Sequence, residues 1–223
     1  MYVLYQLLIV VLFENCESLS SNHVSQSSWL SQEWAAHVLG IPSAKVTCQV
    51  RRIGGGFGGK ETRSLPITSA LAVAAHHLQR PVRISLKRDV DMSITGQRHP
   101  FIGYYKAGFS REGKILALDV KLYSNGGNSL DLSMAVMDRA LLHIDNAYSI
   151  PVINAVGKVC KTNIPSNTAF RGFGGPQGMM VIEAIMQRAA LKLGMPAWKL
   201  RELNLYRENE LTHYVSGGYW LTR

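Results

Sequence analysis

The spacing of hydrophobic and polar residues divides the chain into helices and strands joined by short polar segments. Apolar residues recur at helical spacing in several stretches, and Gly followed by Pro ends two of them, after Leu39 and after Leu193. β-rich stretches between them predict strands, and Ser110–Lys114 predicts a hairpin turn. The predicted helices are Trp29–Leu39, Leu65–Leu78, Leu130–Ile144, Gln177–Leu193 and Trp198–Leu205. The predicted strands are Lys45–Ile53, Pro81–Lys87, Phe101–Phe109, Ile115–Ser124 and Asn154–Lys161.

This mixture of helices and strands, with one hairpin, predicts an α+β (mixed α/β) fold. The polar stretches Ser18–Ser31 and Asn163–Phe170 are predicted to be loops, and no low-complexity linker divides the sequence. A chain of 223 residues, 47% of them hydrophobic, can form one large or two small domains with a buried core.

The N-terminal stretch Tyr2–Phe13 is apolar apart from Gln6. Its length of about twelve residues is too short to span a bilayer, which needs about twenty. The stretch has the length of a signal-peptide core, but no basic residue precedes it. We therefore expect either a buried strand or a stretch foreign to the domain that follows, and no association with a membrane.

The charge and the cysteines exclude several classes of function. The formal net charge is +9, and all 24 Lys and Arg residues lie from Lys45 onward. Such a basic chain could bind an anionic cofactor or an acidic partner, but the basic residues are scattered, so no nucleic acid is expected. The three cysteines are widely spaced and form no Cys-x-x-Cys pair, which argues against a disulfide framework and against a zinc or iron–sulfur site in this stretch. A reducing compartment fits best.

The sequence Gly-Phe-Gly-Gly occurs twice, at Gly56–Gly59 and at Gly172–Gly175, each time ahead of a predicted helix. Because glycine loses the most backbone freedom on folding, such a run indicates a backbone that approaches a ligand closely or adopts positive φ. A large aromatic residue among glycines indicates a ring held beside a ligand.

Two phosphate-binding interpretations of the first loop are possible. Gly54-x-Gly56-x-x-Gly59 matches the dinucleotide-binding pattern, but the strand before it is polar, whereas the first strand of such a fold is buried on both faces. Gly54-x-x-x-x-Gly59-Lys60 matches a P-loop except that Glu61 replaces the Ser or Thr that binds Mg²⁺. A carboxylate beside phosphates would repel them, so both interpretations are disfavoured.

Longer motifs surround both loops: Arg52–Arg63 (RIGGGFGGKETR) and Lys161–Gly178 (KTNIPSNTAFRGFGGPQG). Further distinctive stretches are Asp91–Pro100, Asp138–His143 and Asn204–Tyr206. In this order, they resemble the xanthine dehydrogenase/oxidase family of molybdenum hydroxylases. The resemblance implies a partial molybdopterin-binding domain over residues 24–214, between an unmatched N-terminal segment, 1–23, and an unmatched tail, 215–223.

The resemblance implies that molybdenum is held by the dithiolene of molybdopterin and not by side-chain ligands. Gln26 falls where the family has a glutamine that hydrogen-bonds an oxygen ligand of molybdenum. Phe57, with Gly58, and Arg171 correspond to backbone contacts with the metal centre. Gln26, Phe57 and Arg171 are therefore the residues expected at the molybdenum, although a solvated loop Gln and a surface Arg remain the alternatives for the first and last.

The resemblance also implies a purine site. Glu61 and Arg139 correspond to the pair that handles the purine, where the Arg can stabilise negative charge on a ring oxygen and the Glu can hydrogen-bond ring nitrogens. Phe173 corresponds to an aromatic residue that stacks on the purine. The related aldehyde oxidases usually have apolar residues in place of the Glu–Arg pair, so hypoxanthine and xanthine are the expected substrates and urate the product. For Glu61, a carboxylate at a helix N-terminus is a bland alternative.

Members of the family are several times longer than this chain. The two [2Fe–2S] clusters, FAD and the glutamate that acts as general base are expected outside it, so no catalytic residue is expected here and the chain alone is expected to be inactive. The resemblance further implies a cytoplasmic or peroxisomal homodimer at full length. The alternatives are a non-catalytic truncated product or gene-model fragment that only binds a full-length partner, and an aldehyde oxidase-like hydroxylase.

Overall fold

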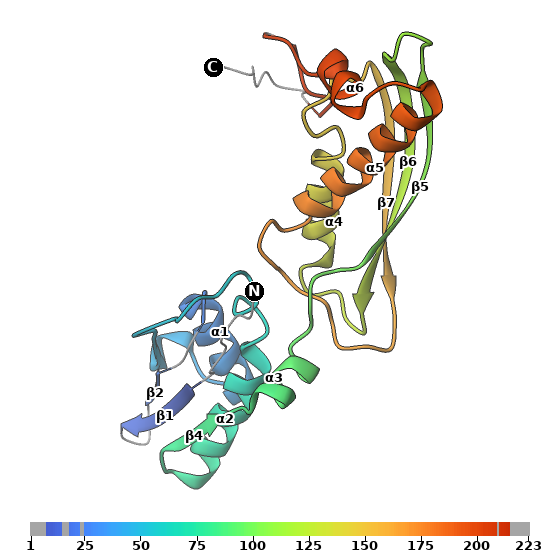
Figure 1. The fold of residues 1–223 in the computed structure, drawn as a ribbon. Coiled ribbons are helices and arrows are strands. Elements are labelled where there is room, and N and C mark those ends of the chain that lie inside the picture. Colours follow the sequence, from blue (N-terminus) through green and yellow to red (C-terminus); the bar gives the residue numbers. More distant parts are fainter. Residues whose placement is uncertain (1–7, 15–17, 23–24, 209, 215–223) are drawn as a thin grey trace. The chain divides into compact units, whose positions relative to one another are not determined.

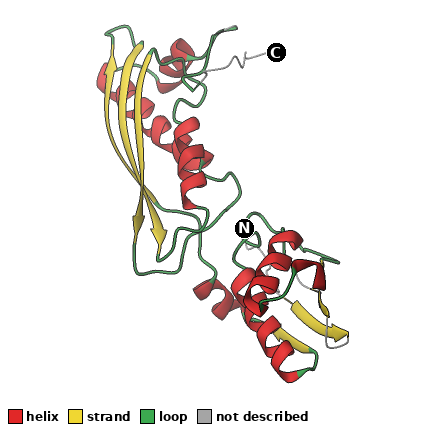
Figure 2. Cartoon of the chain, turned by 180° about the vertical axis from the view of Figure 1, so that it is seen from behind, coloured by secondary structure: helices red, strands yellow, loops and turns green. Residues whose placement is uncertain are grey.

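The computed structural model describes residues 8–14, 18–22, 25–208 and 210–214 (Figure 1). The chain forms two units, each assembled from separate stretches of sequence. Unit 1 comprises residues 1–98, 127–131 and 163–171, and unit 2 comprises residues 99–126, 132–162 and 172–223. Both units combine helices with a sheet, which confirms the predicted α+β class (Figure 2).

Unit 1 contains a four-stranded sheet in the order β3-β2-β1-β4. Strand β1 pairs antiparallel with both β2 and β4, whereas β2 and β3 are parallel and β3 lies at one edge. The strands are β1 (Leu8–Glu14), β2 (Ser18–Asn22), β3 (Val46–Gln49) and β4 (Val82–Ser85). The helices are α1 (Ser28–Leu39), the 3-10 helix η1 (Ser43–Lys45), α2 (Leu65–Leu78) and α3 (Arg88–Ile94).

Helices α1 and α2 pack together in the core of unit 1. Their contact is made largely of alanines, among them Ala35 and Ala72, both fully buried, and these small side chains let the two helices approach closely. Helix α1 begins where Ser27 Oγ accepts a hydrogen bond from Leu30 N at 3.3 Å, and it ends at Gly40 with φ 66°. The helix end predicted from Gly40 is therefore confirmed.

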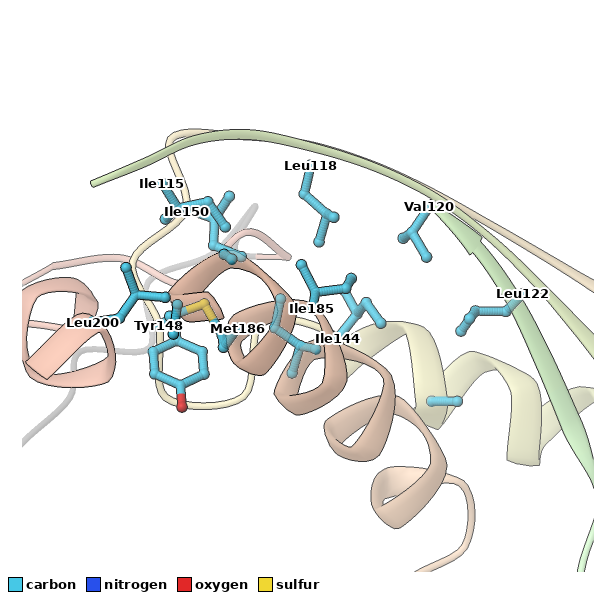
Figure 3. Packing of buried hydrophobic residues seen from close by; sticks show 14 of the residues in the cluster. Ile115, Leu118, Val120, Leu122, Ile144, Tyr148, Ile150, Ile185, Met186 and Leu200 are labelled. Carbon is cyan, nitrogen blue, oxygen red and sulfur yellow. The ribbon is translucent and has the colours of Figure 1, made fainter. Parts of the chain in front are cut away.

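Unit 2 contains a three-stranded sheet in the order β5-β6-β7, with α4 and α5 packed against one face (Figure 1). Leu118, Val120 and Leu122 alternate along β6 and point toward the helices, where Ile185 and Met186 of α5 meet them (Figure 3). The strands are β5 (Phe101–Phe109), β6 (Ile115–Gly127) and β7 (Val152–Lys161). The helices are α4 (Ser133–Leu142), α5 (Gly175–Leu193) and α6 (Ala197–Asn204).

The predicted hairpin is present between β5 and β6. Ser110 N donates to Lys114 O at 2.8 Å, and Gly113 provides the positive φ of 93°. The buried Asn204 ties this turn to α6, because its side chain accepts from Ile115 N and donates to Gly113 O, both at 2.8 Å. The turn is thus part of the packed unit.

Most predicted elements are confirmed, but several differ, among them the predicted strand Lys45–Ile53, of which only Val46–Gln49 forms a strand. The predicted loop Ser18–Ser31 is wrong, because it contains β2 and the start of α1. The serine-rich β2 is a strand because β1 and β3 on either side satisfy its backbone, which its own side chains do not reveal. Helix α3 was not predicted, and the predicted helix Leu130–Ile144 is shorter, since it begins only at Ser133.

The apolar N-terminal stretch forms a strand from Leu8 onward, and residues 1–7 lie outside the described part. Among the described residues, no helix is both long enough and apolar enough to cross a membrane.

Candidate functional site

The first Gly-Phe-Gly-Gly loop is a tight turn with two left-handed residues at its centre. Phe57 has φ 51° and Gly58 has φ 89°, and Gly59 N donates to Gly56 O at 3.0 Å. Positive φ at both central positions is the type I′ pattern. For a residue with a side chain, this conformation costs about 1–2 kcal/mol. Such strain persists where surrounding structure imposes it, and it clusters at ligand sites.

Gln26 lies directly on this turn. A Cβ added to Gly56 would be 2.4 Å from Gln26 Cδ, so only glycine lets the amide lie there. Gln26 N donates to Lys60 O at 2.9 Å, and Lys60 N donates to Gln26 Oε1 at 3.1 Å. Because a backbone N–H must face an acceptor, the amide oxygen is fixed and Nε2 points elsewhere. Nε2 makes no hydrogen bond to the residues that the structure describes.

Glu61 lies between the first loop and α2. The helix begins at Leu65 and has no acidic residue in its first turn, so the interpretation of Glu61 as a helix-terminal carboxylate is wrong. Glu61 N donates to Gly58 O at 3.2 Å, which ties it to the strained turn. Burial, and then the negative charge of Asp131, raises the pKa of the Glu61 carboxyl.

Asp131 is the second carboxylate of this region. Its backbone has φ 43°, and its Oδ1 accepts a hydrogen bond from Thr62 Oγ1 at 2.7 Å. Its Oδ2 is buried and has no hydrogen-bond partner among the described residues. Unit 1 therefore places two acidic groups, from distant parts of the sequence, within electrostatic reach of each other.

The segment that precedes the second loop also belongs to unit 1 and packs against the first loop. A Cβ on Gly58 would be 2.8 Å from the carbonyl of Ala169. The Arg98 guanidinium lies over the Phe170 ring, with Cζ 4.5 Å from its centroid, and Nη2 donates to Arg171 O at 2.8 Å. Arg98 thereby fixes the backbone of Arg171, two residues after the Ala169 that contacts the first turn. Four predicted cofactor residues, Gln26, Phe57, Gly58 and Arg171, lie in one unit.

In unit 2, the second loop repeats the conformation of the first. Phe173 has φ 47° and Gly174 has φ 93°, and Gly175 N donates to Gly172 O at 2.9 Å. The turn is seated on α4, because a Cβ on Gly174 would be only 2.0 Å from the carbonyl oxygen of Val136. Helix α5 begins directly at this turn, as predicted for this loop.

Helix α4 carries Arg139 in its last turn. The Arg139 side chain is exposed and makes no hydrogen bond or ion pair with the described residues. Unit 2 thus joins the helix of Arg139 to the turn of Phe173, two of the three predicted substrate residues. The third, Glu61, belongs to unit 1, so the Glu61–Arg139 pair stays a prediction.

Both turns present unbonded backbone donors. The N–H groups of Phe57 and Gly58, and likewise those of Phe173 and Gly174, make no hydrogen bond to the described residues. Successive N–H groups on a turn form a typical binding place for oxyanions. Within the described part, no group of three or more His, Cys, Asp or Glu residues could hold a metal ion. In unit 1, the donors of the first turn and of Gln26 fit a cofactor bound through its oxygen atoms.

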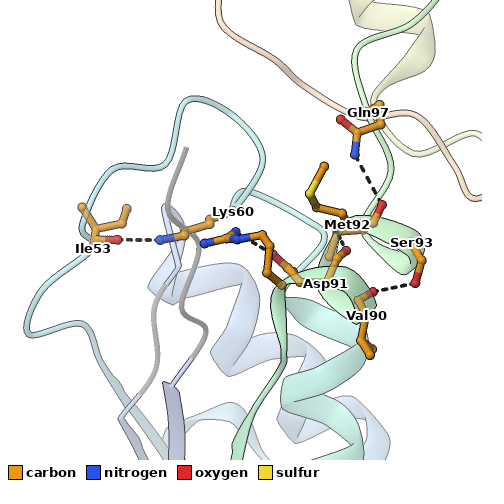
Figure 4. A network of polar contacts seen from close by, with 9 residues as sticks. Ile53, Lys60, Val90, Asp91, Met92, Ser93 and Gln97 are labelled. Atoms are coloured by element: carbon orange, nitrogen blue, oxygen red, sulfur yellow. Dashed lines mark hydrogen bonds and ion pairs between the residues drawn. The ribbon is translucent and has the colours of Figure 1, made fainter. Parts of the chain in front are cut away.

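Two residues of this region were not predicted as part of the site. Arg98 could have been suspected only from its place in a long motif. The P-loop interpretation of Lys60 predicts a side chain that reaches outward to a phosphate. In the structure Lys60 is 2% exposed and its Nζ donates to Ile53 O at 2.6 Å (Figure 4). The edge position of β3 likewise disfavours the dinucleotide interpretation.

A separate hollow in unit 2 lies between the segment Ser149–Ile153 and the segment Glu210–His213. None of the predicted site residues lines it. Beside it, His213 Nδ1 is 2.8 Å from Asp145 Oδ2, to which Tyr206 also donates at 2.6 Å.

Comparison with known proteins assigns the fold to a family. Residues 7–205 match the family model of the molybdopterin cofactor-binding domain. The chain belongs to this family. Over 190 residues, this molybdopterin cofactor-binding domain is 56% identical both to Xanthine dehydrogenase 1 of Arabidopsis thaliana and to Xanthine dehydrogenase/oxidase of Gallus gallus. The matched stretch is 85% of this chain but only 14% of each relative.

Solved structures share the fold of this molybdopterin cofactor-binding domain. The aldehyde oxidoreductase of Desulfovibrio gigas has a TM-score of 0.85 and 26% identity, over 93% of this chain and 23% of that protein. Quinoline 2-oxidoreductase of Pseudomonas putida 86 has a TM-score of 0.79 and 25% identity, over 89% of this chain and 26% of that one. The predicted fold, a part of the cofactor-binding region of a molybdenum hydroxylase, is therefore confirmed.

Proposed function

We propose that this chain is the part of a xanthine dehydrogenase-like enzyme that binds the molybdenum–molybdopterin group and the purine. The reaction of the whole enzyme is the hydroxylation of hypoxanthine and xanthine to urate, with oxygen from water. The observation that carries the proposal is the presence of both Glu61 and Arg139 in a sequence 56% identical to a xanthine dehydrogenase. When bound, the molybdenum group supplies the oxidation; the chain's own residues bind and orient.

The cofactor side of the site consists of neutral donors. Gln26 Nε2 is the free amide donor, because Lys60 N holds the oxygen of the same amide. The N–H groups of Phe57, Gly58 and Arg171 are unbonded to described residues and add three backbone donors. Donors that the fold fixes before an oxygen-bearing group binds need little rearrangement, which is the basis of electrostatic preorganisation.

Three residues are proposed to bind the purine: the Glu61 carboxyl of unit 1, and the Arg139 cation and the Phe173 ring of unit 2. The raised pKa of Glu61 lets its carboxyl exchange a proton with ring nitrogens more readily than an ordinary Glu would. The Arg139 charge is not neutralised by a described acidic partner, so it can stabilise negative charge on a ring oxygen. The Phe173 ring, half-buried on a strained turn, provides a face for stacking on a purine.

One alternative is an aldehyde-oxidising enzyme, and the likeness to the Desulfovibrio gigas structure is the observation in its favour. The identity to xanthine dehydrogenases is about twice as high, 56% against 26%, and this favours purines. The chain spans 14% of those relatives, and we propose that the general base lies elsewhere in the whole enzyme. The 223-residue chain alone is then expected to form no urate, which also fits a non-catalytic product that binds a full-length partner.

A segment exchange tests the proposal. Residues 25–214 replace the matching stretch of Xanthine dehydrogenase 1 of Arabidopsis thaliana, and the unexchanged enzyme is the control. We expect the exchanged enzyme to contain stoichiometric molybdenum and to form urate from xanthine. Full molybdenum content with oxidation of aldehydes only would favour the aldehyde alternative. An exchanged enzyme without molybdenum would contradict the assignment of the cofactor residues.

A further inference from the structure

Lys60 is the most deeply buried cation near the first loop. Its side chain is 2% exposed, and its ammonium donates to the carbonyl of Ile53, the residue just before the glycine run (Figure 4). Since Lys60 itself follows the run directly, this one bond at 2.6 Å joins the two ends of the Ile53–Lys60 segment. We call this segment closed because the Lys60 side chain, and not a pair of strands, joins its first residue to its last.

The backbone of the same residue holds Gln26. Lys60 N donates to Gln26 Oε1, and Lys60 O accepts from Gln26 N. Ser25 Oγ donates to the same carbonyl at 3.2 Å. One residue therefore connects the base of the loop to the amide that lies on Gly56, so a shift of Lys60 would move both.

Burying an ammonium is unfavourable unless other groups compensate it. Burial lowers the pKa of Lys60, the carboxylate of Asp91 opposes this effect, and the charge of Arg88 adds to it. Asp91, on α3, is itself 3% exposed and pairs with Arg88 at 3.4 Å. The Lys60 ammonium therefore has a carbonyl as its hydrogen-bond acceptor, and the charge of the buried Asp91 favours its protonated form.

We propose that Lys60 is a positioning residue: its ammonium keeps the Ile53–Lys60 segment closed, which holds Phe57 in its strained turn and orients the Gln26 amide. That this geometry serves the cofactor rests on the proposed function, whereas the closure of the segment does not. Lys60 touches no reacting atom in this assignment and acts through Gln26 and the turn.

Amide hydrogen exchange on the 223-residue chain tests the closure. The reporters are the N–H groups of Gly59 and Lys60, which bond Gly56 O and Gln26 Oε1, and Ala72 inside α2 reports the unit as a whole. In Lys60→Met we expect Gly59 and Lys60 to exchange about tenfold faster or more, with Ala72 changed less than about twofold. The control, Lys45→Met, removes an exposed lysine of η1 and should change neither.

Lys60→Gln is the second variant, because its shorter side chain keeps a polar group but cannot reach Ile53 O. Lys60→Gln should likewise accelerate amide exchange at residues 59 and 60 but not at Ala72. If Lys60→Met does not fold, the exchange rates of Lys60→Gln alone test the proposal. Equal acceleration at Gly59 and Ala72 would mean that Lys60 only stabilises the unit and would overturn the proposal. Unchanged exchange at Gly59 in a folded variant would overturn it as well.

The link to the cofactor is tested in the exchanged enzyme. Lys60→Met should retain molybdenum, lower kcat for xanthine by about tenfold or more with KM little changed, and alter the Mo(V) electron paramagnetic resonance signal. An unchanged kcat and signal would remove that link. If the parent exchanged enzyme lacks molybdenum, the proposed function fails, whereas the exchange rates in the 223-residue chain still decide the role of Lys60 in the closure.

Discussion

Phe57 and Phe173 adopt the same left-handed backbone conformation, with φ 51° and 47°, although the sequences that flank the two loops differ. In both turns a glycine with φ near 90° follows the phenylalanine, and the i→i+3 hydrogen bonds are 3.0 and 2.9 Å long. Position i+1 of such a turn usually holds Gly, Asn or Asp. A phenylalanine there is unfavourable for the turn itself, and such strain clusters at ligand sites, which agrees with the proposed role of both loops.

The effect of a substitution at Phe57 on stability should depend on how well the new residue tolerates a left-handed backbone, and not on its hydrophobicity. Asn tolerates the left-handed region, whereas a β-branched residue does not. We therefore expect Phe57→Val to lower the free energy of unfolding of unit 1 by about 1–2 kcal/mol relative to Phe57→Asn. Urea unfolding followed by the α2 amides measures the difference. Equal stability of the two variants would show that the turn relaxes out of its left-handed conformation.

Position 174 requires glycine for two reasons: its φ is positive, and α4 leaves no space for a side chain. An added Cβ would lie 2.0 Å from Val136 O, which cannot move without displacing α4. Gly174→Ala should therefore lower the free energy of unfolding of unit 2 by about 3 kcal/mol or more. Gly194→Ala is the matched control, because Gly194 also has positive φ but nothing lies within 4 Å of its added Cβ. Its cost should be about 1 kcal/mol; similar costs at both sites would contradict the packing of the turn on α4.

The Glu61 carboxyl should make unit 1 less stable at neutral pH. Its pKa is raised in the folded state, so the folded state binds the proton more tightly than the unfolded state does. The contribution of this carboxyl to the free energy of unfolding is fully present at pH values below its pKa in the unfolded state. It is lost as the pH rises through its higher pKa in the folded state. Glu61→Gln should thus raise the stability of unit 1 at pH 7 by about 0.5 kcal/mol, after allowance for its partial exposure.

The melting temperature as a function of pH measures this effect, with Glu33→Gln on the exposed side of α1 as the control substitution. The gain from Glu61→Gln should shrink toward zero as the pH falls below about 4. A gain that grows on acidification would show that the pKa of Glu61 is lowered, not raised, in the folded state.

Substrate choice should depend on Glu61 and Arg139 together. In the exchanged enzyme, Glu61→Val with Arg139→Met removes the carboxyl and the cation and leaves apolar groups. We expect kcat/KM for xanthine to fall by about 100-fold or more, with aldehyde oxidation retained or increased. Steady-state kinetics with both substrates tests this. Unchanged xanthine turnover would refute the roles of both residues.

Local patterns predicted most of the helices. Helix α2 has the predicted bounds, and α5 ends at Gly194 as predicted, because helical spacing and a left-handed glycine are properties of neighbouring residues. Strand β2 escaped prediction because its serines have no strand pattern, and its partner β3 lies 24 residues or more away in sequence. Long-range pairing of this kind is not encoded in a short window of sequence.

The site was predictable in its parts but not in its assembly. The glycine runs indicated positive φ or close approach to a ligand. Gly58 and Gly174 confirm the positive φ, and the close neighbours of Gly56, Gly58 and Gly174 are other parts of the protein, so approach to a ligand stays a prediction. The inward direction of Lys60 was not predictable, since a lysine after a glycine run gives no sign of burial. The same holds for Asp131, whose influence on Glu61 joins residues 70 positions apart.

The order in which the chain contributes to its two units has a practical consequence. Residues 127–131 and 163–171 return to unit 1 after the chain has entered unit 2, so the sequence changes unit five times. No single cut of the backbone could release either unit whole. A chain ended after Arg98 would lack Asp131, the partner of Thr62, and Ala169, the neighbour of Gly58. Neither unit could therefore be exchanged between proteins as one continuous segment.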